Sequence, residues 1–148
     1  MSSRWRDLQK ESQNNKKGIK IVLKKFGGSL DPILSLPLDE ARKMLMKLPG
    51  IGPKTADAVL LFSANRPTIP IDTHVNRVAK RLDFAPINGD YEEVRLSLQK
   101  LFDQKDYLDA HLFLISLGRK YCKARKPLCV GCPVKTYCPS KFLGDKND

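Results

Sequence analysis

The chain has 148 residues, which is enough for one domain or two small lobes with a real hydrophobic core. It carries 27 lysines and arginines against 16 aspartates and glutamates, and the resulting net charge of +11 favours a polyanionic partner such as nucleic acid. No apolar run approaches the roughly 18 residues that a membrane span needs, so we expect no membrane partner. The polar N-terminus has no apolar signal region, so we expect an intracellular location, cytoplasmic at the nucleoid if the source is prokaryotic.

The first predicted helix covers residues 4–25, because apolar side chains recur there at helical spacing along one face. This stripe is formed by Ile19, Val22, Leu23 and Phe26. Gly27 and Gly28 are expected to end the helix. Residues 29–38 contain two prolines, and we expect them to form a linker.

The stretch from Leu48 to Ala56 is predicted to join two helices through a tight turn. The first helix is expected to start near Asp39 and to bury one stripe. Its members are Ala41, Met44, Leu45 and Leu48. The second helix is expected to run from Pro53 to about Ala64, and it is apolar nearly all round, which predicts a central, buried position.

Two glycines shape this turn. Gly50 and Gly52 flank one apolar residue and allow backbone N–H groups to come close to another surface. Pro53 suits the first position of a helix, where its missing N–H costs nothing. Unpaired N–H groups at the positive end of a helix dipole attract an anion, and a nucleic-acid phosphate fits so basic a chain. A tight helical corner without a ligand is the alternative interpretation.

Residues 65–71 contain two prolines and several β-branched side chains, so we expect them to run extended. Asp72 is a good N-cap for the next helix. The core face of that helix is expected to be Val75, Val78, Ala79 and Leu82, with Arg77, Lys80 and Arg81 pointing elsewhere. Further helices are predicted at about 90–102 and 106–120, with apolar positions Val94, Leu98, Leu101, Leu108, Leu112, Ile115 and Leu117. The predicted fold is all-α.

Four cysteines lie close together near the C-terminus, and none occurs elsewhere: Cys122, Cys129, Cys132 and Cys138. In a reducing compartment they more naturally hold a metal than form two disulfides. Zinc is the default for four thiolates, but structural zinc sites usually show paired short Cys-x2-Cys knuckles, and one is present here. Wider spacing suits a larger 4Fe–4S cluster, which four thiolates also hold. The spacing by itself leaves zinc and the cluster both open.

Basic residues surround these cysteines, and no acidic residue occurs between Ala110 and Gly144. Such an asymmetry favours an anionic partner, and contacts to DNA phosphates are the expected use. A solvated basic face without a ligand is the alternative.

Lys54 and Asp72 are the candidate catalytic residues. A lysine in the first turn of a helix lies at the positive end of the dipole, which disfavours its ammonium form and favours a nucleophilic amine. The alternative roles are an exposed cation that touches phosphate for Lys54 and a plain N-cap for Asp72. His74 and His111 are isolated histidines, and we expect both to be structural or surface residues.

Three segments together resemble the endonuclease III family of helix-hairpin-helix DNA glycosylases: Leu48 to Leu60, then Ile71-Asp72-Thr73-His74-Val75-Asn76-Arg77-Val78, then the four cysteines. The resemblance covers residues 16–141. It implies a helix-hairpin-helix glycosylase lobe, which is an incomplete six-helix barrel, followed by an iron–sulfur cluster lobe. The implied domains are a polar segment at 1–15, the helical lobe at 16–105, and the last helix with the cluster loop at 106–148.

The resemblance also assigns roles. Lys54 matches the nucleophile of members that are both glycosylases and AP lyases, Asp72 matches the catalytic carboxylate, and the four cysteines match the ligands of a 4Fe–4S cluster. The implied partner is double-stranded DNA with a damaged base or an abasic site. The residues expected to contact it are Leu48, Gly50, Ile51, Gly52, Lys54 and Thr55 of the hairpin and Arg119, Lys123, Arg125 and Lys126 near the cysteines.

One departure from the family concerns helices that members carry ahead of the segment matching residue 16. Without them, we expect the helical lobe to be incomplete and an apolar face to be uncovered, so that the chain meets a partner or a second copy of itself there. The alternative function is a non-catalytic DNA-binding module whose metal centre only staples the C-terminal lobe.

Overall fold

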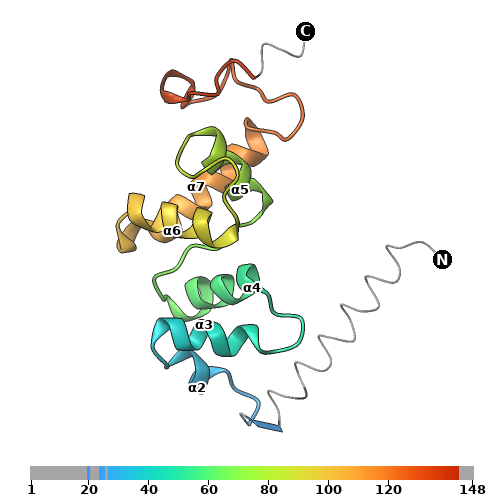
Figure 1. The fold of residues 1–148 in the computed structure, drawn as a ribbon, viewed down its shortest axis with the longest axis vertical. Helices are drawn as coiled ribbons and strands as arrows, with labels where there is room; N and C mark the ends of the chain where they lie inside the picture. The colour runs from blue at the N-terminus through green and yellow to red at the C-terminus, as the bar shows by residue number, and fades with distance from the viewer. Residues whose placement is uncertain (1–19, 21–23, 26, 144–148) are drawn as a thin grey trace, which may run out of the picture. The chain divides into compact units, whose positions relative to one another are not determined.

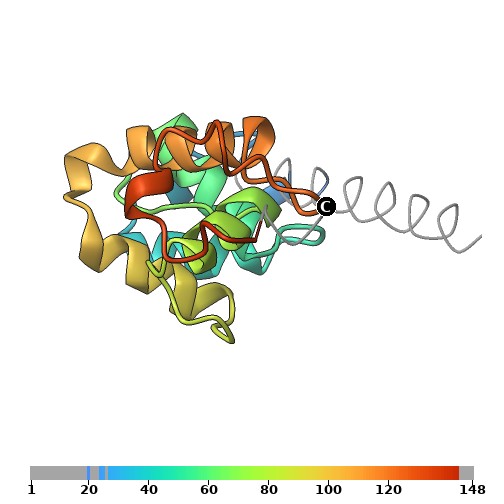
Figure 2. The ribbon, with the colours of Figure 1, turned by 90° about the horizontal axis from the view of Figure 1, so that it is seen from above.

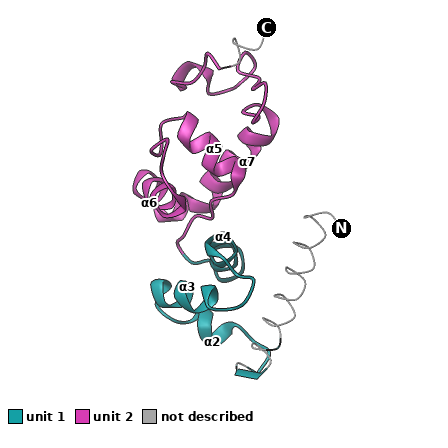
Figure 3. Cartoon of the chain, turned by 45° about the vertical axis from the view of Figure 1, so that its right-hand side comes forward, with its two compact units in different colours: residues 1–66 teal, residues 67–148 magenta. Residues whose placement is uncertain are grey.

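The structure is a computed structural model that describes residues 20, 24–25 and 27–143. The chain divides into two compact units, residues 1–66 and 67–148, and each is described by itself (Figure 3). The domain boundary expected between residues 105 and 106 stays a prediction. The helices on both sides of that point pack against the same helix of the second unit. Most of the predicted helix at 4–25, its apolar stripe and the boundary after residue 15 lie outside the described residues.

Residues 27–66 of the first unit form three helices and a π-helical turn (Figure 1). They are α2 (Asp31–Leu34), α3 (Leu38–Met46), α4 (Pro53–Ala58) and η1 (Val59–Ser63). Gly27 and Gly28 both have positive φ in the turn that precedes α2, as expected of glycines that end a helix. The core is apolar and includes the predicted stripe of α3. Its buried members are Ile33, Ala41, Leu45, Leu48, Ala56 and Leu60.

Helix α2 lies where a linker was predicted. The Oγ atom of Ser29 accepts a hydrogen bond from the N–H of Asp31 at 3.1 Å, and Pro32 takes a first-turn position that needs no N–H donor. Ile33 is only 1% exposed, so core packing stabilises this single turn. The prolines that indicated a linker are therefore compatible with a short helix.

The second helix of the hairpin is not buried on all sides, which corrects the prediction. After Ala58 the α-helix changes into the π-turn η1, and Phe62 is 54% exposed while Leu60 and Leu61 are buried. The N–H of Arg66 donates to the carbonyl of Leu60 at 2.8 Å and so closes the end of the segment.

The second unit contains α5 (Thr73–Arg81), α6 (Tyr91–Leu101) and α7 (Tyr107–Lys120), with single 3-10 turns η2 (Gln104–Asp106) and η3 (Lys135–Tyr137). Figure 2 shows α6 in yellow and α7 in orange, joined at one end by the short turn that includes η2. The described residues contain no strand, and the all-α prediction is confirmed. Residues 65–72 run without helix, as predicted.

Helix α5 packs chiefly against α7 and also against α6. Gly118 of α7 allows a close approach, because a Cβ atom at that position would lie 3.0 Å from the Cβ of His74. The predicted core positions Val75, Val78 and Ala79 are fully buried. The phase of the last helix differs from the prediction: its buried face is Tyr107, Ala110, His111, Leu114, Leu117 and Gly118.

Several apolar side chains of α6 and α7 remain exposed, including three that the sequence had suggested for the core. They are Leu96, Leu101, Leu108, Leu112 and Phe113. The expectation that an uncovered apolar face meets another polypeptide stays a prediction. Among the described helices, none combines the length and apolar character that crossing a membrane requires.

Candidate functional site

The hairpin turn presents backbone donors. Gly50 has a φ of +83°, in the region that favours glycine, and a side chain at Gly52 would meet no atom within 4 Å. The N–H of Ile51 donates to the carbonyl of Leu48 at 3.2 Å, so this donor, which was expected to be unpaired, is used inside the turn. Within the described part of the chain, the N–H groups of Gly50 and Gly52 have no intramolecular acceptor. The turn therefore keeps two donors for an external anion.

The side chains of the hairpin turn differ in exposure: an apolar side chain is buried, and a lysine and a threonine are exposed. Leu48 is 6% exposed and belongs to the core of the first unit, so its side chain is not available for the predicted DNA contact. Ile51 is half-buried against the same core. Lys54 and Thr55 are exposed in the first turn of α4, and Lys54 is not enclosed in an apolar pocket of its unit.

A buried ion pair that the sequence did not reveal joins the two helices of the hairpin. The Arg42 guanidinium on α3 donates to Asp57 Oδ1 at 2.7 Å and to Asp57 Oδ2 at 3.0 Å. The Asp57 side chain is fully buried and lies one turn after Lys54 on α4. Such a two-point contact between planar groups fixes the rotation of α4 relative to α3. It therefore fixes the direction in which Lys54 leaves the helix.

Asp72 caps α5, as predicted. Its Oδ1 atom accepts a hydrogen bond from the N–H of Val75 at 2.7 Å. Asp72 also lines an open hollow of the second unit, together with Ile71, Thr73, Asn76, Lys80, Gly89 and Tyr91. The carboxylate is thus both fixed by the helix end and accessible to a ligand. Of the two candidate catalytic residues, Lys54 belongs to the first unit and Asp72 to the second.

The segment before Asp72 is held by two side chains from different helices. The hydroxyl of Tyr91 on α6 accepts a hydrogen bond from the N–H of Ile71 at 3.2 Å, and Nδ1 of His111 on α7 donates to the carbonyl of Pro70 at 3.0 Å. Burial lowers the pKa of His111, and the Asp72 charge and the Pro70 hydrogen bond oppose this effect. His111 is therefore a structural histidine, as expected, and it is neutral at physiological pH.

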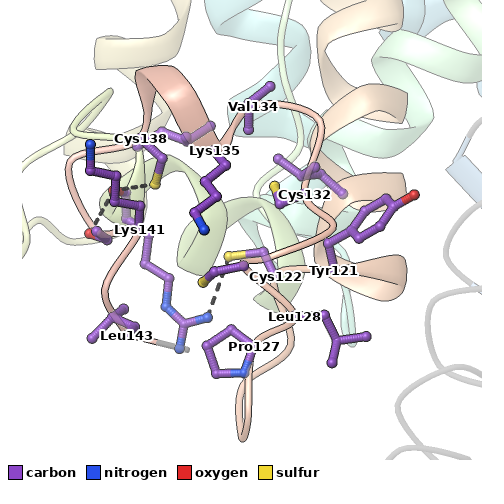
Figure 4. A pocket seen from close by; sticks show the side chains of 15 residues that line it. Tyr121, Cys122, Pro127, Leu128, Cys132, Val134, Lys135, Cys138, Lys141 and Leu143 are labelled. Carbon is purple, nitrogen blue, oxygen red and sulfur yellow. Dashed lines mark hydrogen bonds between the residues drawn. The ribbon is translucent and has the colours of Figure 1, made fainter. Parts of the chain in front are cut away.

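The four cysteines line one pocket of the second unit, at the end of α7 (Figure 4). All four are half-buried, and none is in a disulfide. Among residues 121–143, only Pro127 is buried, and η3 is the only helical turn. Apolar packing therefore contributes little to this cysteine segment, residues 121–143.

The chemistry of this pocket suits an iron–sulfur group. Its lining contains four thiols, two lysines and an arginine but no carboxylate. Soft thiolate donors bind iron–sulfur clusters and zinc alike. Burial raises the pKa of the Cys138 thiol, and the other three cysteines raise it further, so binding there requires loss of a proton.

Two arginines of α5 connect that helix to the cysteine segment, and the sequence had assigned them only to positions away from the core. Arg77 donates from Nε to the carbonyl of Cys122 at 2.8 Å and from Nη2 to the carbonyl of Gly118 at 3.0 Å. Arg81 donates to the sulfur of Cys122 at 3.4 Å. Their partners lie more than forty residues downstream, beyond the reach of local sequence patterns.

The basic residues predicted to contact DNA near the cysteines are all exposed: Arg119, Lys123, Arg125 and Lys126. Arg119 lies in the last turn of α7, and the other three follow in the first part of the cysteine segment. Positive charge on short, exposed stretches of chain suits contact with phosphates.

The structure combines an α-helical hairpin, whose turn keeps free N–H donors, with a basic four-cysteine pocket further along the chain. These two features define a helix-hairpin-helix protein with a metal-binding C-terminal segment. Comparison with known proteins gives the same two parts. Residues 40–62 match the helix-hairpin-helix motif, and residues 122–138 match the iron–sulfur binding domain of endonuclease III.

Relatives extend the match along the chain. Endonuclease III of Sulfolobus acidocaldarius is 39% identical over 118 residues, which cover 80% of this chain and 53% of the relative. Endonuclease III of Bacillus subtilis is 35% identical over 136 residues, covering 92% of this chain and 58% of the relative. A solved structure of a trapped covalent endonuclease III–DNA intermediate, with an estranged adenine, superposes with a TM-score of 0.78 at 35% identity, covering 89% of this chain and 58% of that one.

The chain is similar to endonuclease III over most of its own length and has the all-α helix-hairpin-helix glycosylase fold of that family. It spans somewhat more than half the length of these relatives. The iron–sulfur match decides between the two metal centres that the cysteine spacing left open, in favour of a 4Fe–4S cluster.

Proposed function

We propose that the chain acts in DNA base-excision repair as an endonuclease III type glycosylase with AP-lyase activity. Its substrate is duplex DNA with a damaged base or an abasic site. The observation that carries this proposal is Lys54, an exposed amine in the first turn of α4 directly after the hairpin turn. A protein that only binds DNA has no need for a lysine whose direction is fixed by the buried Arg42–Asp57 pair.

Each candidate residue has its own step. The lone pair of Lys54 Nζ forms a bond to C1′ of the sugar, and at a damaged nucleotide the N-glycosidic bond breaks and the base leaves with its electron pair. The adduct loses a proton and opens to an imine, and removal of a C2′ proton then expels the 3′ phosphate. The Asp72 carboxylate stabilises the positive charge that develops on the sugar as the base leaves.

The remaining residues bind DNA and the cluster. The free N–H groups of Gly50 and Gly52 and the exposed cations Lys123, Arg125 and Lys126 support contacts to backbone phosphates. Arg119 and Thr55 add exposed donors, whereas Leu48 supports the turn from the core: its side chain is buried, and its N–H donates to the carbonyl of Leu45 at 3.0 Å. We assign the cluster ligands to Cys122, Cys129, Cys132 and Cys138, and the bound cluster supplies a cross-link between distant parts of the segment. The proposed location is intracellular, cytoplasmic in a prokaryote, because cysteines that bind a cluster need a reducing compartment in which they do not pair as disulfides.

Borohydride trapping on abasic DNA tests the enzymatic proposal. Abasic DNA already lacks the base, so the experiment isolates the lysine chemistry. We expect the cluster-loaded chain to give a covalent adduct and Lys54→Gln to reduce it at least about 1,000-fold, since the variant has no amine to form the imine. The matched control is Lys43→Gln, which removes an exposed lysine from α3 of the same unit and should trap like the wild type.

DNA binding measured on the same proteins separates the two functions. Lys54→Gln should bind abasic DNA within about threefold of the wild type, because one exposed cation contributes little to a multi-phosphate contact. If the loaded wild type binds abasic DNA and gives no adduct, the enzymatic proposal is wrong and the non-catalytic binding module replaces it.

A further inference from the structure

Arg81, the last residue of α5, bonds to both ends of the cysteine segment. At the first end its guanidinium donates to Cys122 Sγ at 3.4 Å, to the carbonyl of Lys123 at 2.7 Å and to the carbonyl of Ala124 at 3.2 Å. At the other end its own carbonyl accepts a hydrogen bond from Ser140 Oγ at 2.8 Å and, as long as the Cys138 thiol carries its proton, a second one from that thiol at 3.8 Å. The dashed lines in Figure 4 mark bonds to Cys122 and to the residues at the far end of the segment.

These bonds replace the packing that the segment lacks. Pro127 is its only buried residue within 121–143, so apolar contacts do not hold its two ends together. Closing a flexible loop of this length costs conformational entropy, and an anchor that binds both ends removes part of that cost before any metal enters. Helix α5 can serve as the anchor because Val75, Val78 and Ala79 fix it in the core of the unit.

Arg81 also differs from its neighbours in what it touches. Arg77 bonds to backbone carbonyls and to His74 but to no sulfur, and Lys80 lines the hollow next to Asp72. Among the described residues, Arg81 is therefore the side chain that donates a hydrogen bond to the sulfur of a proposed cluster ligand. A hydrogen bond from a cation to a sulfur ligand stabilises the more negative state of an iron–sulfur group and so raises its reduction potential.

We propose that Arg81 is a positioning residue of the iron–sulfur site, which holds the two ends of the cysteine segment together and donates a charged hydrogen bond to Cys122. Its role concerns retention and potential of the cluster and does not depend on the enzymatic activity proposed above. The guanidinium matters for its geometry as well as its charge, because one fork reaches a sulfur and two carbonyls at once.

The test compares cluster-loaded Arg81→Gln and Arg81→Lys with the wild type. Two quantities are measured: the rate at which the cluster is lost to an iron chelator, followed by its visible absorbance, and its midpoint potential by voltammetry. We expect Arg81→Gln to lose the cluster at least about tenfold faster, the size of one lost charged hydrogen bond, and to shift the potential to more negative values. Arg81→Lys should keep most of the potential but still lose the cluster faster, because one ammonium nitrogen cannot occupy the positions of both Nη1 and Nη2.

Lys120→Gln is the matched control for charge. It removes an exposed cation from the last turn of α7, at the entrance to the same segment, and should leave both quantities near wild type. The proposal is overturned if Arg81→Gln matches the wild type in both measurements, or if Lys120→Gln changes them as much. If Arg81→Gln does not load, hydrogen exchange of residues 121–143 in Arg81→Lys and wild-type apoprotein decides: equal protection contradicts the proposal, and faster exchange in the variant supports it.

Discussion

The hairpin of the first unit and the cysteine segment of the second are both proposed to contact DNA, and they reach a defined shape in different ways. The hairpin rests on an apolar core that includes Leu45, Leu48 and Leu60, and the buried Arg42–Asp57 pair joins its helices. The cysteine segment buries one proline and depends on hydrogen bonds from α5.

This difference separates two sources of order. Packing and a desolvated ion pair are properties of the polypeptide alone, so the hairpin should keep its shape whatever the state of the cofactor. A segment without a core needs cross-links, and four sulfur ligands supply them when a cluster is bound. Loss of the cofactor should therefore act on one region and not on the other.

The largest expected effect is that of removing the cluster. Hydrogen exchange in residues 121–143 should become much faster, because only the hydrogen bonds from α5 and little apolar packing then hold the segment, while α3 and α4 keep their protection. Hydrogen-exchange mass spectrometry on loaded and chelator-treated protein measures both regions at once. Equal protection before and after treatment would contradict this prediction. Iron and sulfide analysis should first confirm the cluster. Stoichiometric zinc in protein made with ample iron would contradict the cofactor assignment.

Breaking the ion pair should give the opposite pattern. Asp57→Ala leaves the Arg42 guanidinium largely buried without its carboxylate, and such changes cost about 3–5 kcal/mol. Exchange should accelerate in α3 and α4, and the cluster should stay bound. Denaturant unfolding measures the loss. Replacing both partners by apolar residues, with Arg42→Met and Asp57→Leu, should recover much of it, and failure of this double variant would show that the pair acts through other contacts.

Gly118 allows a test of the contact between α5 and α7 that carries the cysteine segment. Gly118→Ala places a methyl group 3.0 Å from the Cβ of His74, and overpacking of this kind costs about 1–3 kcal/mol. Thermal unfolding and the rate of cluster loss should both respond. Gly131→Ala is the control inside the segment, since its added Cβ would lie an ordinary 3.8 Å from the Tyr121 ring. A Gly118→Ala variant that unfolds at the wild-type temperature and loses the cluster at the wild-type rate would contradict the close approach of α5 and α7.

The smallest effect concerns pH. Burial lowers the pKa of His111 in the folded chain below its ordinary value of 6.5, so the unfolded chain binds the proton more readily. This contribution to stability is present above the unfolded pKa and is lost as the pH falls below about 6.5. His111→Gln should flatten the decline in unfolding free energy between pH 7.5 and 5.5. Parallel curves for variant and wild type would show that His111 is not the group responsible.

Local patterns predicted the elements that local chemistry determines. Asp72 caps α5 because a carboxylate before a helix satisfies a free N–H, and Ala41 and Leu45 are buried because helical spacing places them on one face. Residues 65–72 form no helix, because the two prolines in this range disfavour helical backbone. The family resemblance identified the iron–sulfur segment, which spacing left undecided.

Features that depend on distant partners were missed. Asp57 is the one acidic residue between Pro53 and Ser63, and nothing near it in the sequence indicates that its partner is Arg42. Arg77 and Arg81 carry the same charge as many surface residues of this chain, and their role is visible only once the cysteine segment lies against α5. Leu101, Leu108 and Leu112 were assigned to the core because apolar spacing does not show which of two faces is covered.

The π-turn η1 bears on how this region tolerates changes in length. A π-turn accommodates one residue more than an α-turn, which is why the consecutive residues Leu60 and Leu61 are both buried and Phe62 faces solvent. The extra residue lies after the hairpin turn and after Asp57, so the phase of α4 from Pro53 to Ala58 is set before it. Deletion of one residue within Val59–Ser63 would turn the π-turn into an ordinary α-turn, and we expect the direction of Lys54 to be unchanged by it.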